Sequence, residues 1–203
     1  APAVSSTCTY PLTNKPEDVW AAKMNDWFKT NYCLDMHYYG EYPGYYMRYL
    51  KERNIVPVME EGDAALLKSA KMDFIALNYY RTLCASYLPA DEEHPAGMRV
   101  YRGNEVDFDQ YGYCRDEKNV NLKASEYGAQ IDPMGLRIVL NDYYARYHLP
   151  LIITENGLGT PDVLTEDGKV HDDYRIDYIR GHVEAMALSI EDGVDLMGYC
   201  PWS

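Results

Sequence analysis

Several features that would indicate other classes of protein are missing from this sequence of 203 residues. The five cysteines are odd in number and widely spaced, without a C-x-x-C pair, which favours reduced thiols over a disulfide framework or a zinc site. No apolar run is long enough to span a bilayer, and no basic leader followed by an apolar stretch opens the chain. The Gly-x-Ser-x-Gly elbow, the P-loop and the Rossmann fingerprint are absent, and the histidines lack metal-ligand spacing. These absences argue against a membrane-spanning protein, a serine hydrolase of that type and a nucleotide-binding enzyme.

Positive charge is also scarce. Lysine and arginine together number 19 against 32 aspartates and glutamates, so the formal net charge is −13. An acidic surface of this kind repels nucleic acid and anionic membranes, and we predict neither as a partner. It does not exclude a small neutral or anionic substrate, because the charge of the binding site itself decides that affinity. With the free thiols, these features predict a cytoplasmic protein, for which a homo-oligomer remains open.

One short stretch organises the rest of the chain. Residues 151–154, Leu-Ile-Ile-Thr, form an apolar, β-branched run too short for an ordinary helix, and Pro150 precedes it. This pattern predicts a strand buried on both faces, ended by a turn at Asn156 and Gly157. Glu155 is then a carboxylate at the C-terminal tip of a buried strand, where parallel α/β proteins place catalytic groups. The alternative is a solvated glutamate that opens a turn.

The order of elements predicts an α/β fold with a parallel sheet. Strands are expected at residues 3–9, 72–80, 151–154 and 194–199, with helices between them, which is a repeated βαβ pattern. We interpret it as roughly the second half of a (β/α)8 barrel, about strands 5 to 8, with residues 1–203 forming the C-terminal part of one catalytic domain. Half a barrel leaves unpaired edges, so upstream and downstream segments are expected in the functional protein.

Two further expectations concern the connections. Residues 81–131 have no hydrophobic periodicity and are rich in glycine, proline and polar residues, so an elaborate loop over a cleft is expected there. The helix expected over residues 172–191 carries six apolar residues at helical spacing, which predict its buried face. They are Ile176, Ile179, Val183, Met186, Ala187 and Ile190.

Other strand tips supply partners for Glu155. Tyr80 and Asn78 lie near the tip of the strand at 72–80, and Trp202 follows the last strand. A tyrosine can donate a hydrogen bond that holds a carboxylate, an amide can bind a hydroxyl, and an indole offers a flat wall for a sugar ring. Glycoside hydrolysis needs two carboxylates, and only one is well placed here, so the second is expected before residue 1. Without Glu155, a polar strand end with no role would be the simpler interpretation.

Several motifs, in the correct order, resemble glycoside hydrolase family 1. Residues 153–157, Ile-Thr-Glu-Asn-Gly, resemble the family's nucleophile motif. Residues 73–80, Asp-Phe-Ile-Ala-Leu-Asn-Tyr-Tyr, resemble its D-F-x-G-x-N-Y-Y strand. Further matches lie at residues 40–43, 172–178 and 198–203. Residues 130–137 and Pro201 are typical of the bacterial 6-phospho-β-glucosidases within the family.

The resemblance implies a retaining glycosidase that cleaves 6-phospho-β-glucosides by double displacement, without a metal or organic cofactor. Glu155 would be the nucleophile and Tyr80 would orient it, while Asn78 and Trp202 would line the site for the sugar. The acid/base glutamate would lie in an N-E-P motif before Ala1. The 203 residues alone are then expected to be inactive.

One departure and several alternatives remain. The family's E-W-G-W segment is Glu-Tyr-Gly-Ala at residues 126–129, so Ala129 removes an aromatic ring from the expected rim of the cleft. This affects the expected sugar and aglycone preference, glucose against galactose included. A β-glucosidase for unphosphorylated sugars and a 6-phospho-β-galactosidase are the enzymatic alternatives. A catalytically incomplete fragment, or a protein that only binds sugar, is the non-enzymatic one.

Overall fold

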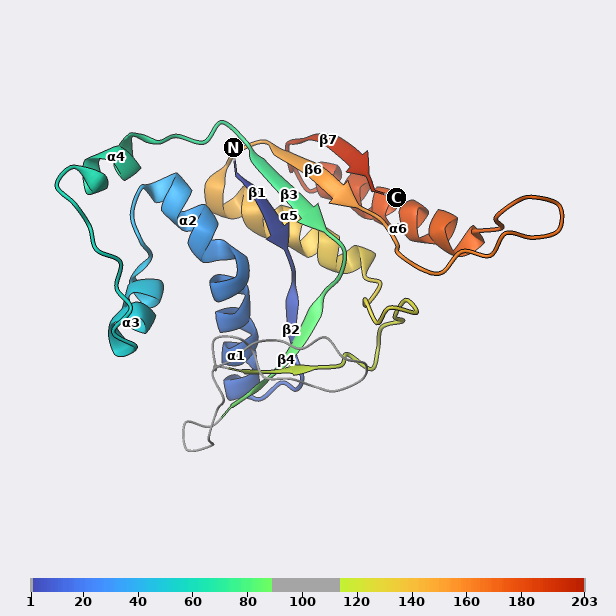
Figure 1. Ribbon diagram of the computed structural model, residues 1–203, viewed down its shortest axis with the longest axis horizontal. Coiled ribbons are helices and arrows are strands. Elements are labelled where there is room, and N and C mark those ends of the chain that lie inside the picture. Colours follow the sequence, from blue (N-terminus) through green and yellow to red (C-terminus); the bar gives the residue numbers. More distant parts are fainter. Residues whose placement is uncertain (1, 89–113, 203) are drawn as a thin grey trace.

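The computed structural model describes residues 2–88 and 114–202. Its centre is a sheet of four parallel strands in the order β1-β3-β6-β7. The strands are β1 (Ala3–Ser6), β3 (Ile75–Tyr79), β6 (Leu151–Asn156) and β7 (Leu196–Pro201). Neighbours in the sheet are also neighbours in the order of these four strands, and helices connect them (Figure 1). The predicted α/β fold with a parallel sheet is confirmed.

The helices begin and end near the expected signals. They are α1 (Pro16–Asp26), α2 (Tyr32–Tyr39), α3 (Gly44–Glu52), α4 (Asp63–Ser69), α5 (Pro133–Tyr147) and α6 (Asp173–Glu191), with a π-helical turn, η1 (Trp27–Asn31), between α1 and α2. Pro16 and Pro133 occupy first-turn positions, where a missing N–H costs nothing. Gly40 ends α2 with φ of +69°, and a Cβ atom there would lie 2.6 Å from the Cα of Lys68. Both observations require glycine at this position.

The main core lies between the sheet and α5, and α6 contributes Met186 to it (Figure 1). One face of α5 is buried, since Leu136, Val139, Leu140 and Tyr143 are all at most 3% exposed. Leu77 and Ile153 from the centre of the sheet complete this core with 0% exposure.

The expected buried face of α6 is wrong. Of its six apolar residues only Met186 is buried, whereas Ile176, Val183 and Ile190 are 45–53% exposed. The inward face carries mainly polar or small residues, and they are Tyr178, His182, Ala185, Met186 and Ser189. Polar side chains can be buried when they are hydrogen-bonded, and hydropathy periodicity cannot detect that compensation.

The expectation of an irregular loop over residues 81–131 is also wrong in part. β4 (Leu83–Tyr87) and β5 (Cys114–Glu117) form a second sheet with β2 (Thr9–Pro11), in the order β2-β4-β5. β2 and β4 are parallel, and β4 and β5 are antiparallel. These strands are only three to five residues long and form by pairing with distant residues, such as Ser86 with Glu117 at 2.6 Å, so no local periodicity marks them. The rest of the expected loop, residues 89–113, lies outside the described residues.

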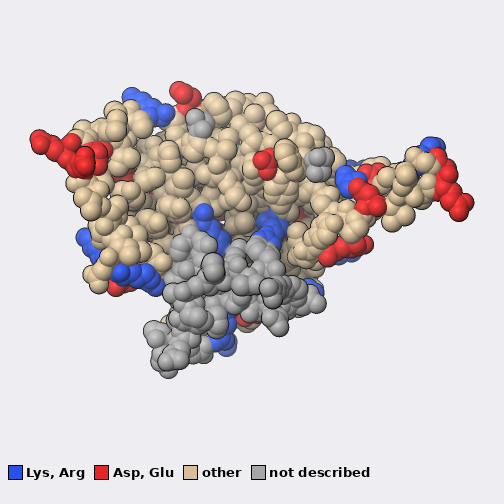
Figure 2. All heavy atoms as spheres, viewed as in Figure 1, with Lys and Arg blue, Asp and Glu red and all other residues tan. Residues whose placement is uncertain are grey.

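The face of the parallel sheet turned away from α5 and α6 carries little charge. Figure 2 shows acidic side chains gathered at the two ends of this view, by α4 and by the loop that follows β6, and only a few charged side chains between them, one of them acidic and near the middle of the face. In the described part of the chain, no helix is both long enough and apolar enough to cross a membrane.

Candidate active site

A β-bulge at the end of β6 determines where Glu155 points. In the pairing with β3, Ile153 faces Leu77 but Glu155 faces Asn78, so Thr154 is an extra residue. The pairing with β7 is irregular at the same place, where Ile153 faces Tyr199 and Asn156 faces Pro201. In a regular strand, Glu155 would share the helix-facing side of Ile153. The bulge turns it to the opposite face, as bulges beside active sites commonly do.

Tyr80 and Glu155 are brought together as expected. The Tyr80 hydroxyl donates a hydrogen bond of 2.7 Å to Oε2 of Glu155. Both residues are half-buried, and Tyr80 directly follows β3. Burial, and next the hydrogen bond to Glu155, raise the pKa of Tyr80 above its ordinary value. The phenol therefore stays protonated and acts as a donor, which leaves Oε1 of Glu155 as the oxygen available to react.

Asn78 lies opposite Glu155 in the strand pairing. Its side-chain oxygen accepts a hydrogen bond of 2.6 Å from the Thr154 hydroxyl, which also lies 3.2 Å from the carbonyl oxygen of Leu77. Thr154, the extra residue of the bulge, thus fixes the amide of Asn78. The NH2 group of that amide is the part that can donate to a ligand hydroxyl.

Trp202 is joined to the site through its backbone. Its N–H donates a hydrogen bond of 2.9 Å to the carbonyl oxygen of Asn156, next to Glu155. A Cβ atom on Gly157 would lie only 1.9 Å from the carbonyl oxygen of Trp202, so only glycine allows this approach. The Trp202 side chain is 58% exposed. The segment after β7 is therefore held against the end of β6 with its indole open to contact.

Ala129 lies in a tight turn whose hydrogen bonds are local. Its carbonyl oxygen accepts a 2.8 Å bond from the Ser125 N–H, and its own N–H lies 3.3 Å from the Ser125 hydroxyl oxygen. The same turn brings the ring of Tyr127 near Gly159, in the loop after β6. The location of Ala129 at the rim of a sugar site stays a prediction.

Sequence reasoning missed a polar network behind the sheet. Asn156 was expected in a turn, but it is the last residue of β6 and is 0% exposed. Its amide nitrogen donates to the carbonyl oxygen of Tyr79 at 2.8 Å and to the hydroxyl of Tyr178 at 3.0 Å, and its oxygen accepts from Tyr199 at 3.1 Å. We call Asn156, Tyr178 and Tyr199 the Asn156 network. The signal available in the sequence was the spacing of Tyr178 and His182, which lie four residues apart and therefore on one face of α6.

Comparison with known proteins identifies the family. The family model described as "Glycosyl hydrolase family 1" matches residues 1–203. The chain belongs to this family. The resemblance found in the sequence motifs is thereby confirmed.

Curated relatives of this family 1 chain include phospho-glucosidases. The chain is 46% identical over 199 residues to the aryl-phospho-beta-D-glucosidase BglH of Bacillus subtilis, covering 98% of this chain and 39% of that protein. It is 38% identical over 193 residues to the 6-phospho-beta-glucosidase AscB of Escherichia coli, covering 95% of this chain and 37% of that protein. The family 1 chain therefore spans well under half the length of the relatives it matches.

Solved structures of family 1 share its architecture. The psychrophilic beta-glucosidase BglU of Micrococcus antarcticus is 30% identical with a TM-score of 0.83, over 99% of this chain and 43% of that one. A family 1 beta-glucosidase of Thermotoga maritima in complex with isofagomine lactam is 28% identical with a TM-score of 0.80, over 99% and 40% of the two chains. The fold of this family 1 chain is therefore part of a (β/α)8 barrel.

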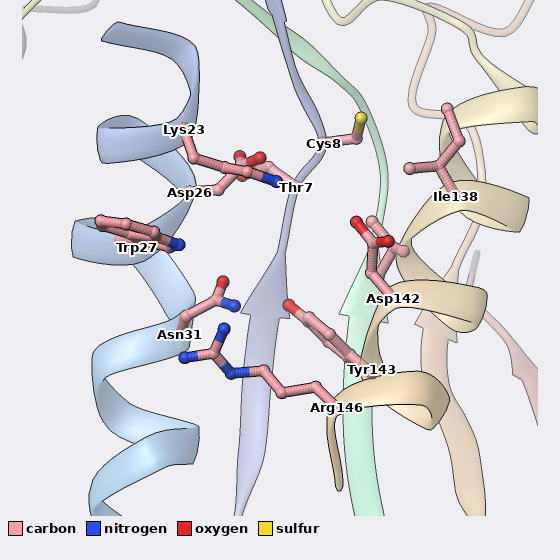
Figure 3. Close-up of a pocket in the computed structure, with 11 residues that line it drawn as sticks. Thr7, Cys8, Lys23, Asp26, Trp27, Asn31, Ile138, Asp142, Tyr143 and Arg146 are labelled. Atoms are coloured by element: carbon pink, nitrogen blue, oxygen red, sulfur yellow. The ribbon is translucent and has the colours of Figure 1, made fainter. Parts of the chain in front are cut away.

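A cavity in this family 1 chain lies away from Glu155. Its volume is about 150 Å³, and it lies between α1 with η1 and α5, on the helix side of the sheet (Figure 3). Lys23 and Asp26 reach into it from one side, and Asp142 and Arg146 from the other (Figure 3). We call it the Asp26 cavity. Since none of the five predicted site residues lines it, it is separate from the candidate active site.

Proposed function

We propose that the intact protein is a retaining glycoside hydrolase that cleaves 6-phospho-β-glucosides, with Glu155 as its nucleophile. The observation that carries this proposal is the 2.7 Å hydrogen bond from Tyr80 to Oε2 of Glu155 at the strand ends. That bond holds one carboxylate oxygen of a side chain that the bulge turns to the face opposite Ile153. Residues 1–203 are proposed to be the C-terminal part of one barrel domain, about strands 5 to 8.

The proposed reaction has two displacements. In the first, Oε1 of Glu155 attacks the anomeric carbon, the bond to the leaving oxygen breaks, and an acid/base glutamate outside this chain protonates that oxygen. In the second, the same glutamate takes a proton from water, the water oxygen attacks the anomeric carbon, and the ester bond to Glu155 breaks. Tyr80 orients Glu155 in both steps. No metal or organic cofactor takes part in this scheme.

Three other residues are proposed to contact the sugar. The NH2 group of Asn78, oriented by Thr154, would donate to a sugar hydroxyl. The exposed indole of Trp202 would pack against the face of the ring. Ala129 would leave space at the rim where an aromatic ring would otherwise lie.

The phosphorylated substrate is favoured by the relatives. BglH and AscB, at 46% and 38% identity, are named as phospho-glucosidases, whereas the two β-glucosidase structures described above are 28% and 30% identical. A β-glucosidase for free sugars and a 6-phospho-β-galactosidase are the competing assignments. Because the chain spans 39% of BglH, we also propose that the 203 residues alone lack activity, and at most bind sugar.

The cellular setting is proposed as the cytoplasm, with a role in carbohydrate metabolism. Cys8, Cys33, Cys84 and Cys200 are free thiols, which fits a reducing compartment. The net charge of −13 supports the absence of nucleic acid or membrane partners. A homo-oligomer is compatible with this proposal.

The test uses the full-length protein with Glu155→Gln. Glutamine keeps the size of the side chain but removes the nucleophile, so we expect turnover of 4-nitrophenyl β-glucoside 6-phosphate to fall by at least about a thousandfold. Glu184→Gln, at an exposed position of α6, is the matched control and should keep full turnover. Retained turnover in Glu155→Gln would overturn the proposal. Parallel assays with 4-nitrophenyl β-glucoside and the galactoside 6-phosphate decide between the competing substrates.

A further inference from the structure

The Tyr80–Glu155 pair is held from behind the sheet by α6. The Tyr178 hydroxyl lies 3.3 Å from the carbonyl oxygen of Tyr80 and donates to it. The same hydroxyl accepts a 3.0 Å hydrogen bond from the amide of Asn156. One oxygen atom on α6 therefore contacts both the backbone of Tyr80 and the residue next to Glu155.

We propose that Tyr178 is a positioning residue, which fixes the distance between Tyr80 and Glu155 through Asn156. This inference rests on the proposed function, because it assumes that Glu155 reacts with substrate. Tyr178 itself lies on the helix side of the sheet and does not touch the reacting atoms. It acts by holding the ends of β3 and β6 in one relative position at the place where the bulge interrupts their regular pairing.

Asn156 transmits this constraint because its side-chain nitrogen and oxygen are both held by hydrogen bonds. Its amide nitrogen donates hydrogen bonds to the carbonyl oxygen of Tyr79 and to the Tyr178 hydroxyl, and its oxygen accepts a hydrogen bond from the Tyr199 hydroxyl. These partners come from β3, α6 and β7. The side chain cannot rotate without breaking three hydrogen bonds in a site that water does not reach.

His182 holds the ring of Tyr178 in place. The two rings are stacked, with centroids 3.9 Å apart and planes 29° apart. Nδ1 of His182 lies 2.7 Å from the carbonyl oxygen of Tyr178, one turn earlier on the same helix. Burial lowers the pKa of His182 and raises that of Tyr178, so both rings are neutral.

The experiment is a double-mutant cycle in the full-length protein, with Tyr178→Phe, Tyr80→Phe and the double variant. Phenylalanine keeps the stacked ring and removes only the hydroxyl. Because the hydroxyl makes one hydrogen bond to Tyr80 and one to Asn156, both of which are lost, we expect Tyr178→Phe to lower kcat for 4-nitrophenyl β-glucoside 6-phosphate about fivefold to tenfold, with little change in KM. The double variant should be no slower than Tyr80→Phe, because Tyr178 acts through that residue.

Tyr143→Phe is the matched control. Tyr143 is also a buried tyrosine on the helix side, 3% exposed, but its hydroxyl bonds to Ser6 on β1. It should lower stability without lowering kcat. If Tyr178→Phe does not fold, Tyr199→Phe removes a single outer bond of Asn156 and should lower kcat in the same direction by a smaller factor.

Two results would overturn the inference. One is a fold decrease in kcat for the double variant that equals the product of the decreases for the two single variants. The other is a decrease in kcat for Tyr143→Phe as large as that for Tyr178→Phe. Its failure is distinguishable from failure of the proposed function. If Glu155→Gln abolishes turnover while the cycle is additive, only the role of Tyr178 is wrong, whereas an active Glu155→Gln removes the proposed function itself.

Discussion

Two polar clusters lie on the helix side of the parallel sheet, and they differ in charge. The Asn156 network is built from an amide and two phenols, whose hydrogen bonds join four elements. The Asp26 cavity is lined by two carboxylates and two cationic side chains, and the Thr7 hydroxyl in it has no hydrogen-bond partner among the described residues. Neutral groups that satisfy one another rigidify a fold, whereas a buried carboxylate lowers its stability.

The pKa of Asp26 shows this cost directly. Burial raises it from an ordinary carboxyl value to about 7, although a 2.6 Å hydrogen bond from Thr9 and the charge of Lys23 oppose the shift. Desolvation therefore outweighs the local partners of this carboxylate. The neutral cluster is therefore held by mutual hydrogen bonds, whereas the cavity contains a carboxylate whose ionisation lowers stability.

The largest effect is expected at the join between β6 and the segment after β7. In Gly157→Ala the new Cβ would lie 1.9 Å from the carbonyl oxygen of Trp202, so one backbone must move. We expect the free energy of unfolding of the full-length protein to fall by about 3 kcal/mol, with most activity lost. Thermal unfolding and turnover measure both. Gly159→Ala is the control, since its nearest neighbour, the ring of Tyr127, lies at 3.6 Å, and near-normal stability is expected.

A charge placed in the Asn156 network should make it resemble the Asp26 cavity. Asn156→Asp replaces a donor by an acceptor opposite the carbonyl oxygen of Tyr79, at a position that is 0% exposed. We expect a loss of about 2–3 kcal/mol in the free energy of unfolding at pH 7. The loss should shrink as the pH falls, because the introduced carboxyl group is then protonated and uncharged.

Asn121→Asp, at an exposed position, is the control for this substitution and should be nearly neutral. Chemical denaturation at pH 5 and pH 7 separates the two variants. Equal stability of Asn156→Asp and the unmodified protein at pH 7 would contradict the description of Asn156 as a buried, hydrogen-bonded junction.

Removing the charge from the Asp26 cavity should have a smaller, opposite effect. A carboxyl group with a raised pKa in the folded state binds its proton more tightly there than in the unfolded chain. Stability therefore falls as the pH rises from about 4 to about 7, and Asp26 costs stability above that range. We expect Asp26→Asn to raise the free energy of unfolding at pH 8 by about 1–2 kcal/mol, because it removes the ionised carboxylate. The gain is modest because the cavity is partly open to solvent, which reduces the desolvation penalty of that carboxylate.

The gain from Asp26→Asn should disappear near pH 4, where both forms of the position are neutral. Melting temperatures across this range test it, with turnover as a second measurement that should not change. A constant gain at all pH values would show that the benefit comes from packing and not from the lost charge.

The sequence alone determined the parts that depend on local order. The apolar run before Glu155 is a property of neighbouring residues, and it forms the strand β6 as expected, although Ile152 and Thr154 are only half-buried and the strand is not buried on both faces. The tips of β3 and β6 could be placed side by side because parallel strands end at one edge, which is why Tyr80 and Glu155 were expected to meet.

Only the tertiary structure decided what depends on pairing between distant residues. The extra residue at Thr154, which turns Glu155 to the face opposite Ile153, is visible only in the registers with β3 and β7. The inward face of α6 can carry polar residues because Tyr178 is bonded to Asn156 and to the backbone of Tyr80, and the short strands β4 and β5 form only by pairing across a long separation in the chain. Periodicity records which residues are apolar, whereas hydrogen bonds formed across the fold decide which polar residues can be buried.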